Sequence, residues 1–205
     1  MINNIKYILS RIINRKPVSI KNSTISKDAA VGNGAQIVDS TIGKYTYIYE
    51  SKLIATDVGS FCSIAADCTI GGGSHPCDWV SSSPVFYSGK NCMKKNFSGN
   101  EYNEYKRTKI GNDVWIGSKC LIKGGIKIGD GAIVGMGSVV THDIPAYEIW
   151  AGNPAKRIRK RFNDSTIEKL LDLKWWNMGD EILEDVGKYF NDPEALFKYI
   201  EEENQ

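Results

Sequence analysis

A six-residue repeat organises most of this chain. Aliphatic residues recur at every sixth position from Ile110 to Val140 without slippage, and shorter runs with the same spacing begin at Ile25 and Val58. An even period suits the two-residue alternation of a β-strand and does not suit the 3.6-residue period of an α-helix. Each hexad is therefore expected to be a short strand followed by a corner. Coils of such hexads should stack at about 4.8 Å, the spacing of paired strands, into a prism. The repeated positions are Ile25, Val31, Ile37, Ile42, Ile48, Ile54, Val58, Ile64, Ile70, Ile110, Ile116, Ile122, Ile128, Val134 and Val140.

Small side chains fill the fifth position of many hexads, and this position is expected to face the narrow interior of the prism. These residues are Ala29, Ala35, Thr46, Cys62, Cys68, Ser74, Cys120, Ala132 and Ser138. Three cysteines fall in this set, so we assign them to packing. The chain has five cysteines, an odd number that cannot all pair, and its first residues lack the pattern of a signal peptide. These features predict a reduced, cytoplasmic protein.

The repeat stops after Ile70 and resumes at Ile110, and residues 76–107 are predicted to form a long excursion loop. This segment carries six aromatic residues, namely Trp79, Phe86, Tyr87, Phe97, Tyr102 and Tyr105. Loops of this length inside a compact domain are usually functional. The aromatic content argues against a disordered insertion.

The two ends of the chain predict helices. Residues 1–21 contain five basic residues and no acidic residue, with isoleucine and leucine at helical spacing. We expect a short amphipathic helix there, which either lies on an anionic membrane surface at the inner face of the membrane or covers the first coil of the prism. Residues 162–205 are predicted to form a helical tail. Ser165 and Glu168 match a capping box at its start, and Asp192 before Pro193 matches the start of its last helix. Residues 22–161 are left for the repeat domain.

The overall composition excludes several classes of function. The chain has 205 residues, enough for one compact domain, and 26 basic and 24 acidic residues give a formal net charge of only +2. No strong overall field attracts nucleic acid, and the basic run at 156–161 lacks the signature of a nucleic-acid-binding fold. With His75 and His142 as the two histidines, one subunit cannot supply three imidazoles to a metal, so we expect no metal.

Five segments carry a resemblance to a known family. The segments GNDVWIG at 111–117, IGDGAIVGMGSVV at 128–140 and AGNPAKRIRKRF at 151–162 resemble the left-handed β-helix acyltransferases, which are built on hexapeptide repeats. GSFCSIAADCTIGGGSHPCDW at 59–79 and LLDLKWW at 170–176 resemble their xenobiotic acetyltransferase branch, whose members acetylate antibiotics or sugars with acetyl-CoA. The resemblance implies a mainly β protein with a left-handed parallel β-helix. It also implies a homotrimer with acetyl-CoA as co-substrate, and active sites between neighbouring prisms that the excursion loop reaches.

His75 is the candidate catalytic residue. Acetyl transfer to a hydroxyl needs a base that accepts the hydroxyl proton near neutral pH, and imidazole has a suitable pKa. His75 is expected at the end of the hexad that begins at Ile70, and either Asp78 or a backbone carbonyl would orient its other nitrogen. His142 is a competing base, and Cys77 raises the alternative of a nucleophilic cysteine with an acyl-enzyme intermediate. The sequence does not identify the donors that would stabilise the oxyanion.

The residues expected to bind the coenzyme lie in the last coils and in the basic segment. By resemblance to galactoside and maltose acetyltransferases of the wider family, Ser118, Met136 and Thr141 should line the groove for the pantetheine arm. Lys156 and Arg159 match the positions that meet the phosphates.

The acceptor is expected to contact aromatic side chains. The candidates are Trp79, Phe86 and Tyr87 of the excursion and Tyr47 of an earlier coil, with Tyr45 and Tyr49 beside it. The primary hypothesis is an O-acetyltransferase that acts on a hydroxyl of a sugar or surface-polysaccharide precursor. The alternatives are an O-acetyltransferase for an antibiotic of streptogramin or chloramphenicol type, an N-acetyltransferase for amino sugars, and a solenoid that binds a partner without catalysis.

Overall fold

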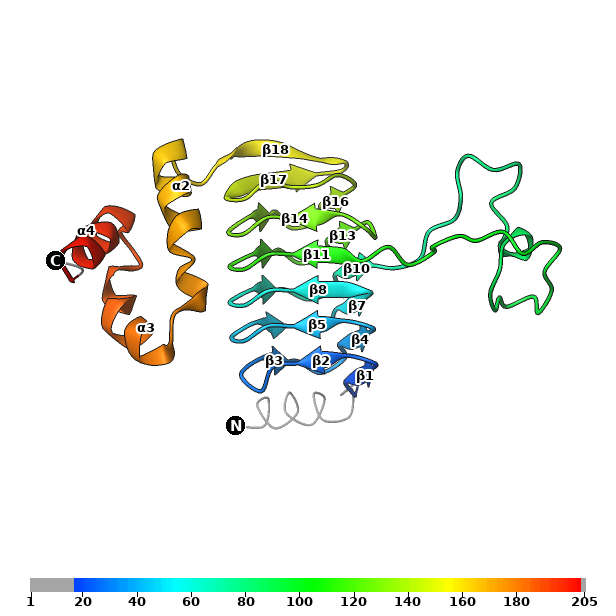
Figure 1. Ribbon diagram of the computed structural model, residues 1–205, viewed down its shortest axis with the longest axis horizontal. Coiled ribbons are helices and arrows are strands. Elements are labelled where there is room, and N and C mark those ends of the chain that lie inside the picture. The colour runs from blue at the N-terminus through cyan, green and yellow to red at the C-terminus, as the bar shows by residue number, and fades with distance from the viewer. Residues whose placement is uncertain (1–16, 204–205) are drawn as a thin grey trace, which may run out of the picture. The chain divides into compact units, whose positions relative to one another are not determined.

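Three sheets form the sides of a β-helix in the computed structural model, which describes residues 17–203 (Figure 1). Sheet A has the order β1 (Ser19–Lys21), β4 (Gln36–Val38), β7 (Lys52–Ile54), β10 (Thr69–Gly71), β13 (Leu121–Ile122) and β16 (Val139–Val140). Sheet B contains β2 (Thr24–Ile25), β5 (Thr41–Ile42), β8 (Thr56–Val58), β11 (Thr108–Ile110) and β14 (Lys127–Ile128). Sheet C contains β3 (Ala30–Val31), β6 (Tyr47–Ile48), β9 (Ser63–Ile64), β12 (Trp115–Ile116), β15 (Ile133–Val134), β17 (Glu148–Gly152) and β18 (Ala155–Lys160).

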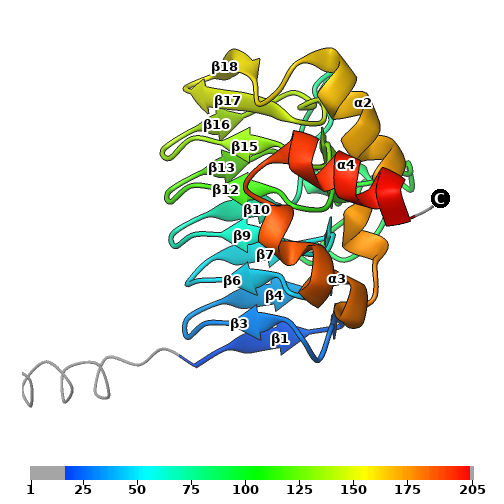
Figure 2. The same ribbon diagram turned by 90° about the vertical axis from the view of Figure 1, so that its left-hand side faces the viewer.

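The strands from β1 to β15 form coils that contribute one strand to each sheet, and β16, β17 and β18 complete sheets A and C; Figure 2 shows the coils stacked from β1 to β18. Strands of successive coils pair in parallel, as in Ile122 opposite Val140 and Ile116 opposite Val134. These paired aliphatic side chains are buried and form one continuous core. The six-residue repeat therefore predicted the β-helix, and its architecture agrees with the left-handed acyltransferase fold that the motifs indicated.

One repeat position was assigned to the wrong residue. Leu53, not Ile54, pairs with Ile37 and Ile70 and is fully buried, whereas Ile54 is only half-buried. Neighbouring residues of a strand point to opposite faces, so an offset of one position exchanges an interior residue for an outward one. The coil from Ile37 to Leu53 spans 16 positions, two fewer than the later coil from Ile122 to Val140.

The cysteines of the repeat are packing residues, as predicted. Cys62, Cys68 and Cys120 are buried, and each thiol donates a hydrogen bond to a glycine carbonyl of the next coil at 3.1–3.2 Å. Burial raises the pKa of Cys62 to about 12. The three thiols are shielded from solvent and act as small core side chains.

Glycines allow the coils to approach closely at the edge between sheets B and C. A Cβ atom on Gly59 would lie 2.5 Å from the carbonyl oxygen of Gly111 on the next coil, and one on Gly43 would lie 2.6 Å from Gly59. The spacing of paired strands leaves no room for a methyl group there. This explains why glycine follows the aliphatic residue in these hexads.

The excursion leaves the coils after β10 and returns at β11 (Figure 1). It starts at Gly72, earlier than the expected 76, because Gly71 and Gly72 adopt φ values of +75° and +109° that turn the chain out of the coil. Ser74 is consequently not an interior residue; its hydroxyl lies 3.1 Å from that of Tyr102 within the loop. A short 3₁₀ helix, η1 (Pro84–Phe86), is the regular element of the excursion.

Most of the predicted N-terminal helix, residues 1–16, lies outside the described residues. The end of the 1–21 segment is not helical, because Ser19–Lys21 is strand β1 and pairs with β4. Pro17 cannot continue a helix in its interior, and the β-branched Val18 and Ile20 favour a strand. The first coil thus begins before residue 22.

The contacts within the chain divide it into two compact units, residues 1–159 and 160–205, and the second unit is helical. It contains α2 (Asp164–Leu173), η2 (Trp175–Asn177), α3 (Asp180–Val186), η3 (Gly187–Tyr189) and α4 (Pro193–Glu203). Trp175 is buried against Trp176 and Phe190, with ring centroids 5.8 and 4.9 Å away, as expected of packing anchors. Within residues 17–203 no helix combines the length and apolar character needed to cross a bilayer.

Of the two helix caps predicted for the tail, the one at α4 is confirmed and the one at α2 is wrong. The capping box at Ser165 was wrong, because Asn163 is the N-cap of α2 and its side-chain oxygen accepts a hydrogen bond from the Thr166 amide at 2.8 Å. The first turn is thus capped two residues earlier than expected. Asp192 caps α4 as predicted, by accepting from the Glu194 amide at 3.1 Å.

Candidate functional site

His75 lies in the excursion, four residues beyond the end of β10, and its side chain is exposed. The expected hexad from Ile70 to His75 does not form, since the coil ends at Gly71. The imidazole is therefore held by loop contacts rather than by a strand.

The ring nitrogen Nδ1 of His75 has two oxygen neighbours. It lies 2.9 Å from the carbonyl oxygen of Ser82 and 3.2 Å from the hydroxyl of Tyr87. A carbonyl oxygen can only accept, so this contact requires the proton on Nδ1. The other nitrogen, Nε2, then carries the lone pair of a base.

Tyr87 is the buried centre of the loop. Its ring lies 6.2 Å from that of Trp79 and 5.3 Å from that of Tyr102, measured between centroids. Burial, together with the charge of Glu104, raises the pKa of the Tyr87 phenol. The hydroxyl of this phenol faces the imidazole instead of solvent.

Hydrogen bonds close the root of the loop. The Ser74 amide donates to the Glu104 carbonyl at 2.8 Å, which brings the two arms together close to His75. At the return of the chain, Arg107 makes a two-pronged contact with Asp57 of β8, both N–O distances being 2.7 Å, and donates to the Asp39 carbonyl at 2.9 Å. The hydrogen bonds from Arg107 lower the pKa of Asp57. These contacts fix where the loop rejoins the coils.

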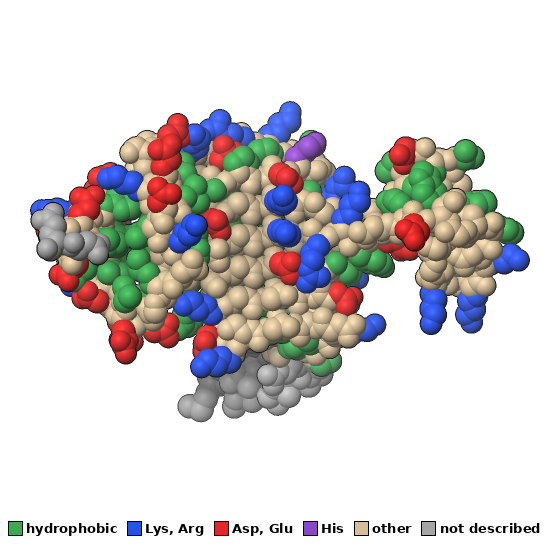
Figure 3. All heavy atoms as spheres, viewed as in Figure 1, with side chains coloured by type: hydrophobic (Ala, Val, Ile, Leu, Met, Phe, Trp, Pro, Cys, Tyr) green, Lys and Arg blue, Asp and Glu red, His purple; other side chains and the backbone are tan. Residues whose placement is uncertain are grey.

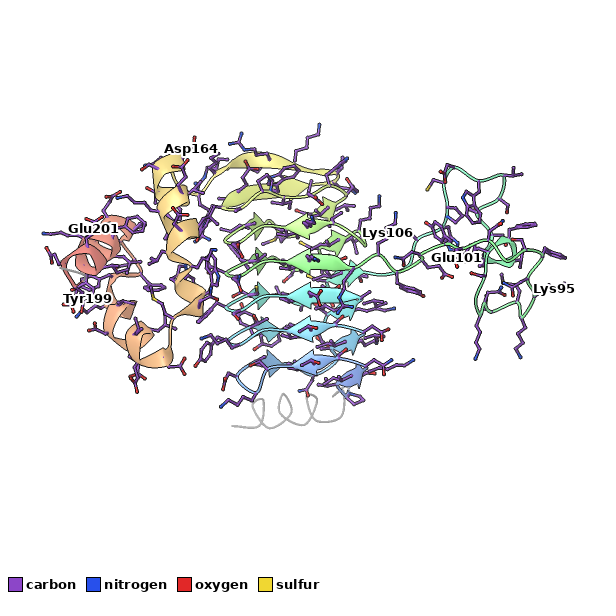
Figure 4. The ribbon with its side chains drawn as sticks, in the orientation of Figure 1. Lys95, Glu101, Lys106, Asp164, Tyr199 and Glu201 are labelled. Carbon is purple, nitrogen blue, oxygen red and sulfur yellow. The ribbon has the colours of Figure 1, made fainter. Side chains whose placement is uncertain are left out.

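The far end of the loop exposes apolar and basic side chains. Phe86 and Phe97 pack together at 5.7 Å between centroids, and both remain exposed. The Lys95 ammonium lies 5.3 Å from the centre of the Phe97 ring. Figure 4 places Lys95 at the far end of the excursion and Lys106 near its root.

The predicted coenzyme residues lie along two different edges of the β-helix. Ser118 and Met136 occupy equivalent corners between sheets C and A, where the Gly137 amide donates to the Ser118 carbonyl at 2.8 Å. Met136 is highly exposed. Thr141 lies on the edge between sheets A and B, just after β16. The excursion that carries His75 leaves the coils at the same edge, but after β10, which is two strands away from β16 in sheet A. One chain therefore does not bring all of these residues together.

Lys156 and Arg159 are exposed on β18. Because side chains alternate along a strand, residues three apart point to opposite faces. Between them, Arg157 forms a 2.9 Å ion pair with the buried Glu148, which also accepts a hydrogen bond from the Trp150 indole at 2.8 Å. This pair fixes β18 against β17.

Two candidate acceptor residues lie away from His75. Tyr47 is on the outer face of sheet C, where its ring is 5.9 Å from that of Tyr49, whereas the excursion joins sheets A and B. Phe86 belongs to the far end of the loop. Among the predicted acceptor residues, Tyr87 contacts His75 directly. Trp79 contacts Tyr87 and is linked to His75 only through it.

The structure also shows where the other candidate catalytic groups lie. The Cys77 thiol contacts the backbone carbonyl of His75 at 3.6 Å rather than its ring. Ser82 supplies the backbone carbonyl that the sequence left as the alternative to Asp78. His142 is exposed, and its Nδ1 lies 2.9 Å from the Thr141 hydroxyl. Among residues 17–203 no group of three or more His, Cys, Asp or Glu side chains is placed to hold a metal ion.

Sequence reasoning missed several groups that position His75. The sequence could not predict that the Ser82 carbonyl contacts His75, since every residue has a backbone carbonyl. The roles of Tyr102 and Glu104 depend on how the two loop arms meet. Arg107 and Asp57 are 50 residues apart, and their pairing follows only from the register of β8 and β11.

Several known proteins are similar to this chain in sequence. A probable macrolide acetyltransferase of Lysinibacillus sphaericus is 40% identical over 132 residues, which are 63% of this chain and 73% of that protein. The chain belongs to the hexapeptide-repeat acyltransferase family. The family pattern described as bacterial transferase hexapeptide (six repeats) matches residues 107–142, and the resemblance drawn from the motifs is confirmed.

Other members of the family match over a shorter share of their length. Chloramphenicol acetyltransferases of Klebsiella aerogenes and Morganella morganii are each 46% identical over 58% of this chain and 58% of their own. The chain thus spans less than two thirds of these relatives. Among solved structures, a hexapeptide-repeat acetyltransferase of Vibrio cholerae has a TM-score of 0.48 with 20% identity, covering 78% of this chain and 81% of its own. A galactoside acetyltransferase in complex with coenzyme A has a TM-score of 0.46 with 24% identity, covering 72% and 66%.

Proposed function

We propose that this protein is an acetyl-CoA-dependent O-acetyltransferase that transfers acetyl directly to an acceptor hydroxyl, with His75 as general base. The observation that supports this proposal is the 2.9 Å contact between Nδ1 of His75 and the Ser82 carbonyl. It fixes the tautomer in which Nε2 accepts a proton, and the ring is exposed at the surface of the loop. Membership of the acyltransferase family supplies the class of reaction.

In the proposed reaction the acceptor oxygen attacks the thioester carbonyl while Nε2 of His75 takes the hydroxyl proton. The tetrahedral intermediate then collapses, its carbon–sulfur bond breaks, and the imidazolium returns the proton to the departing sulfur. The products are the acetyl ester and free coenzyme A. The Ser82 carbonyl and the Tyr87 hydroxyl both face the Nδ1–H bond and stabilise the ring while it carries positive charge.

The coenzyme is proposed to lie between two copies of the chain in a homotrimer. Ser118 and Met136 lie on a different edge from Thr141 and from the root of the His75 loop. A groove formed by one edge of each of two neighbours would unite the two sets. Lys156 and Arg159 are proposed to meet different phosphates of the coenzyme, each from its own face of β18.

The acceptor is proposed to be a hydroxyl of a sugar or surface-polysaccharide precursor, met at a cytoplasmic site. Aromatic rings stack on sugar faces, and Trp79, a half-buried ring that packs against Tyr87 in the loop that carries His75, is such a ring. A second candidate acceptor is an antibiotic hydroxyl, favoured by the names of the chloramphenicol and macrolide acetyltransferases among the relatives. An amino sugar would be acetylated by the same base.

The test of the mechanism is steady-state kinetics of His75→Ala. We expect kcat to fall by about 10²–10⁴-fold with little change in the KM for acetyl-CoA, as loss of a general base requires. His142→Ala is the matched control, because it removes the other imidazole from an exposed corner, and it should leave kcat within about twofold of the parent. Equal rates for the parent and His75→Ala would refute the mechanism, and no turnover in the parent with any acceptor would favour a binding module.

The acceptor is identified by mass spectrometry of the products after incubation with acetyl-CoA and a panel of acceptors. The panel contains sugar nucleotides, oligosaccharides, chloramphenicol, a macrolide and a streptogramin. Rapid acetylation of an antibiotic and none of the sugars would refute the sugar proposal. Alkaline lability of the product separates an ester from an amide.

A further inference from the structure

Four lysines gather on the β-helix beside the place where the excursion leaves and rejoins the coils. Lys106 and Lys123 lie at the edge between sheets A and B, and Lys109 and Lys127 lie on the adjoining strands β11 and β14 of sheet B. All four are exposed. Figure 3 shows basic side chains, with some acidic ones among them, on the coils beside the excursion. We call these four lysines the basic face.

Two lysines of the basic face stand directly opposite each other. Lys109 pairs with Lys127 in the parallel register of β11 and β14. Both side chains point outward from sheet B, because the next residues, Ile110 and Ile128, are buried. Like charges opposite each other on paired strands repel, so a bound anion would relieve an unfavourable interaction.

Two carboxylates border the basic face, and both already have partners. Asp57 is opposite Lys109 on β8, but both of its oxygens accept hydrogen bonds from Arg107. Arg107, with a smaller contribution from Lys109, lowers the pKa of Asp57. Asp143 accepts a hydrogen bond from the Lys127 amide at 2.8 Å. In the part of the chain that the structure describes, none of the four lysines forms an ion pair.

The turn between Lys123 and Lys127 leaves room for a ligand. Gly124 and Gly125 carry no side chain that could cover the backbone there. Lys106 packs onto this turn, since a Cβ atom on Gly125 would lie only 2.8 Å from the Cβ of Lys106. Glycine permits close approach to the backbone, so the basic face flanks an open stretch of chain.

The basic face lies at the edge of the coils from which the loop with His75 leaves. Lys106 is two residues beyond Glu104, and the Glu104 carbonyl accepts a hydrogen bond from the amide of Ser74, the neighbour of His75. An acceptor that reaches the imidazole from the coils therefore passes the basic face. Clustered ammonium groups attract phosphate.

We propose that the basic face binds the phosphate groups of the acceptor, and that this acceptor is a phosphorylated sugar such as a sugar nucleotide. The inference rests on the proposed function and narrows its acceptor class. A neutral antibiotic such as chloramphenicol would gain nothing from the four ammonium groups.

The first test measures binding without catalysis. Isothermal titration calorimetry with inorganic pyrophosphate, in the presence of saturating coenzyme A, should show binding that weakens as sodium chloride is added. Lys109→Gln together with Lys127→Gln should weaken this binding about tenfold, because two ion pairs with the ligand are lost.

The matched control for this variant is Lys21→Gln together with Lys52→Gln. It removes the same charge from exposed positions on sheet A and should leave the affinity for pyrophosphate within about twofold of the parent. Absence of binding to the parent, or an equal loss of affinity in the two variants, would overturn the proposal.

The second test separates the phosphates of the acceptor from those of the coenzyme. With a sugar nucleotide as acceptor, Lys109→Gln together with Lys127→Gln should raise the KM for the acceptor about tenfold and leave the KM for acetyl-CoA within about twofold. A raised KM for acetyl-CoA with an unchanged KM for the acceptor would assign the basic face to the coenzyme and overturn the inference.

The two tests also distinguish this inference from the proposed function. Pyrophosphate binding that depends on these lysines, in a protein that transfers no acetyl group, would refute the proposed function and retain the anion site. Acetyl transfer without such binding would refute the inference alone.

Discussion

Replacing Gly59 by alanine should force two coils of the β-helix apart. The new Cβ atom would lie 2.5 Å from the Gly111 carbonyl oxygen and 2.6 Å from Oδ1 of Asn112. Real Cβ contacts are essentially never below 3.0 Å, so the coils must separate by about 0.5 Å. The backbone of Gly59 does not have a positive φ, and alanine is therefore allowed there except for this contact.

The coils cannot yield freely, because hydrogen bonds connect them at this edge. The Gly59 amide donates to the Ile110 carbonyl at 2.9 Å, and the Ser60 amide donates to Oδ1 of Asn112 at 2.8 Å. Overpacking of this kind costs about 1–3 kcal/mol. For a chain of this size that loss should lower the melting temperature by about 2–10 °C.

The assay is thermal unfolding followed by circular dichroism, with Gly99→Ala as the matched control. Gly99 lies in the excursion and lacks a positive φ, and a Cβ atom added to it would meet no heavy atom within 4 Å. Both substitutions restrict the unfolded chain equally, so their difference isolates the steric effect. Equal melting temperatures for the two variants would refute the argument that coil spacing excludes a methyl group at this edge.

The remaining predictions concern the site. Tyr87→Phe keeps the ring in the aromatic cluster and removes the hydroxyl near Nδ1 of His75, so kcat should fall about 2–10-fold while the KM for acetyl-CoA stays constant; an unchanged kcat would contradict this role. Lys156→Ala and Arg159→Ala should mainly raise the KM for acetyl-CoA, and an unchanged KM would remove these residues from the coenzyme site. Arg107 lowers the pKa of Asp57, so their pair stabilises the fold above the ordinary carboxyl pKa, and the effect is lost as pH falls through the lowered value. Asp57→Asn should therefore cost at most about 1 kcal/mol at pH 7, since the pair is partly exposed, and progressively less as the pH falls below the ordinary carboxyl pKa; a difference that is constant with pH in urea unfolding would contradict the linkage.

The β-helix was predictable because each hexad repeats the same local choice of an inward aliphatic residue and a small residue near the corner. Burial of Ile116, Ile122 and Cys120 follows directly from that pattern. The pattern fails where a coil is shortened, because Leu53 and Ile54 are both aliphatic and only the pairing with Ile37 distinguishes them. It also fails at Gly71, where the backbone conformation ends the coil before the hexad is complete.

The sequence was enough to choose candidate residues for the site, but it did not predict how those residues are arranged. The motif that contains His75 identified the imidazole, whereas the carbonyl that orients it comes from Ser82 through a turn of the loop. Ser118 and Thr141 were expected to share one groove, yet they lie on different edges of one chain. The sequence does not encode which edges would face each other in the proposed homotrimer.

The distribution of cysteines makes the loop chemically addressable in the unaltered protein. Within residues 17–203 all five cysteines are free, and the two exposed ones, Cys77 and Cys92, both lie on the excursion. A maleimide dye or spin label should therefore attach to the loop and spare the coils, where the thiols are shielded. Cys77 is two residues from the imidazole, so a pair of such labels would report bending of this arm when a ligand arrives.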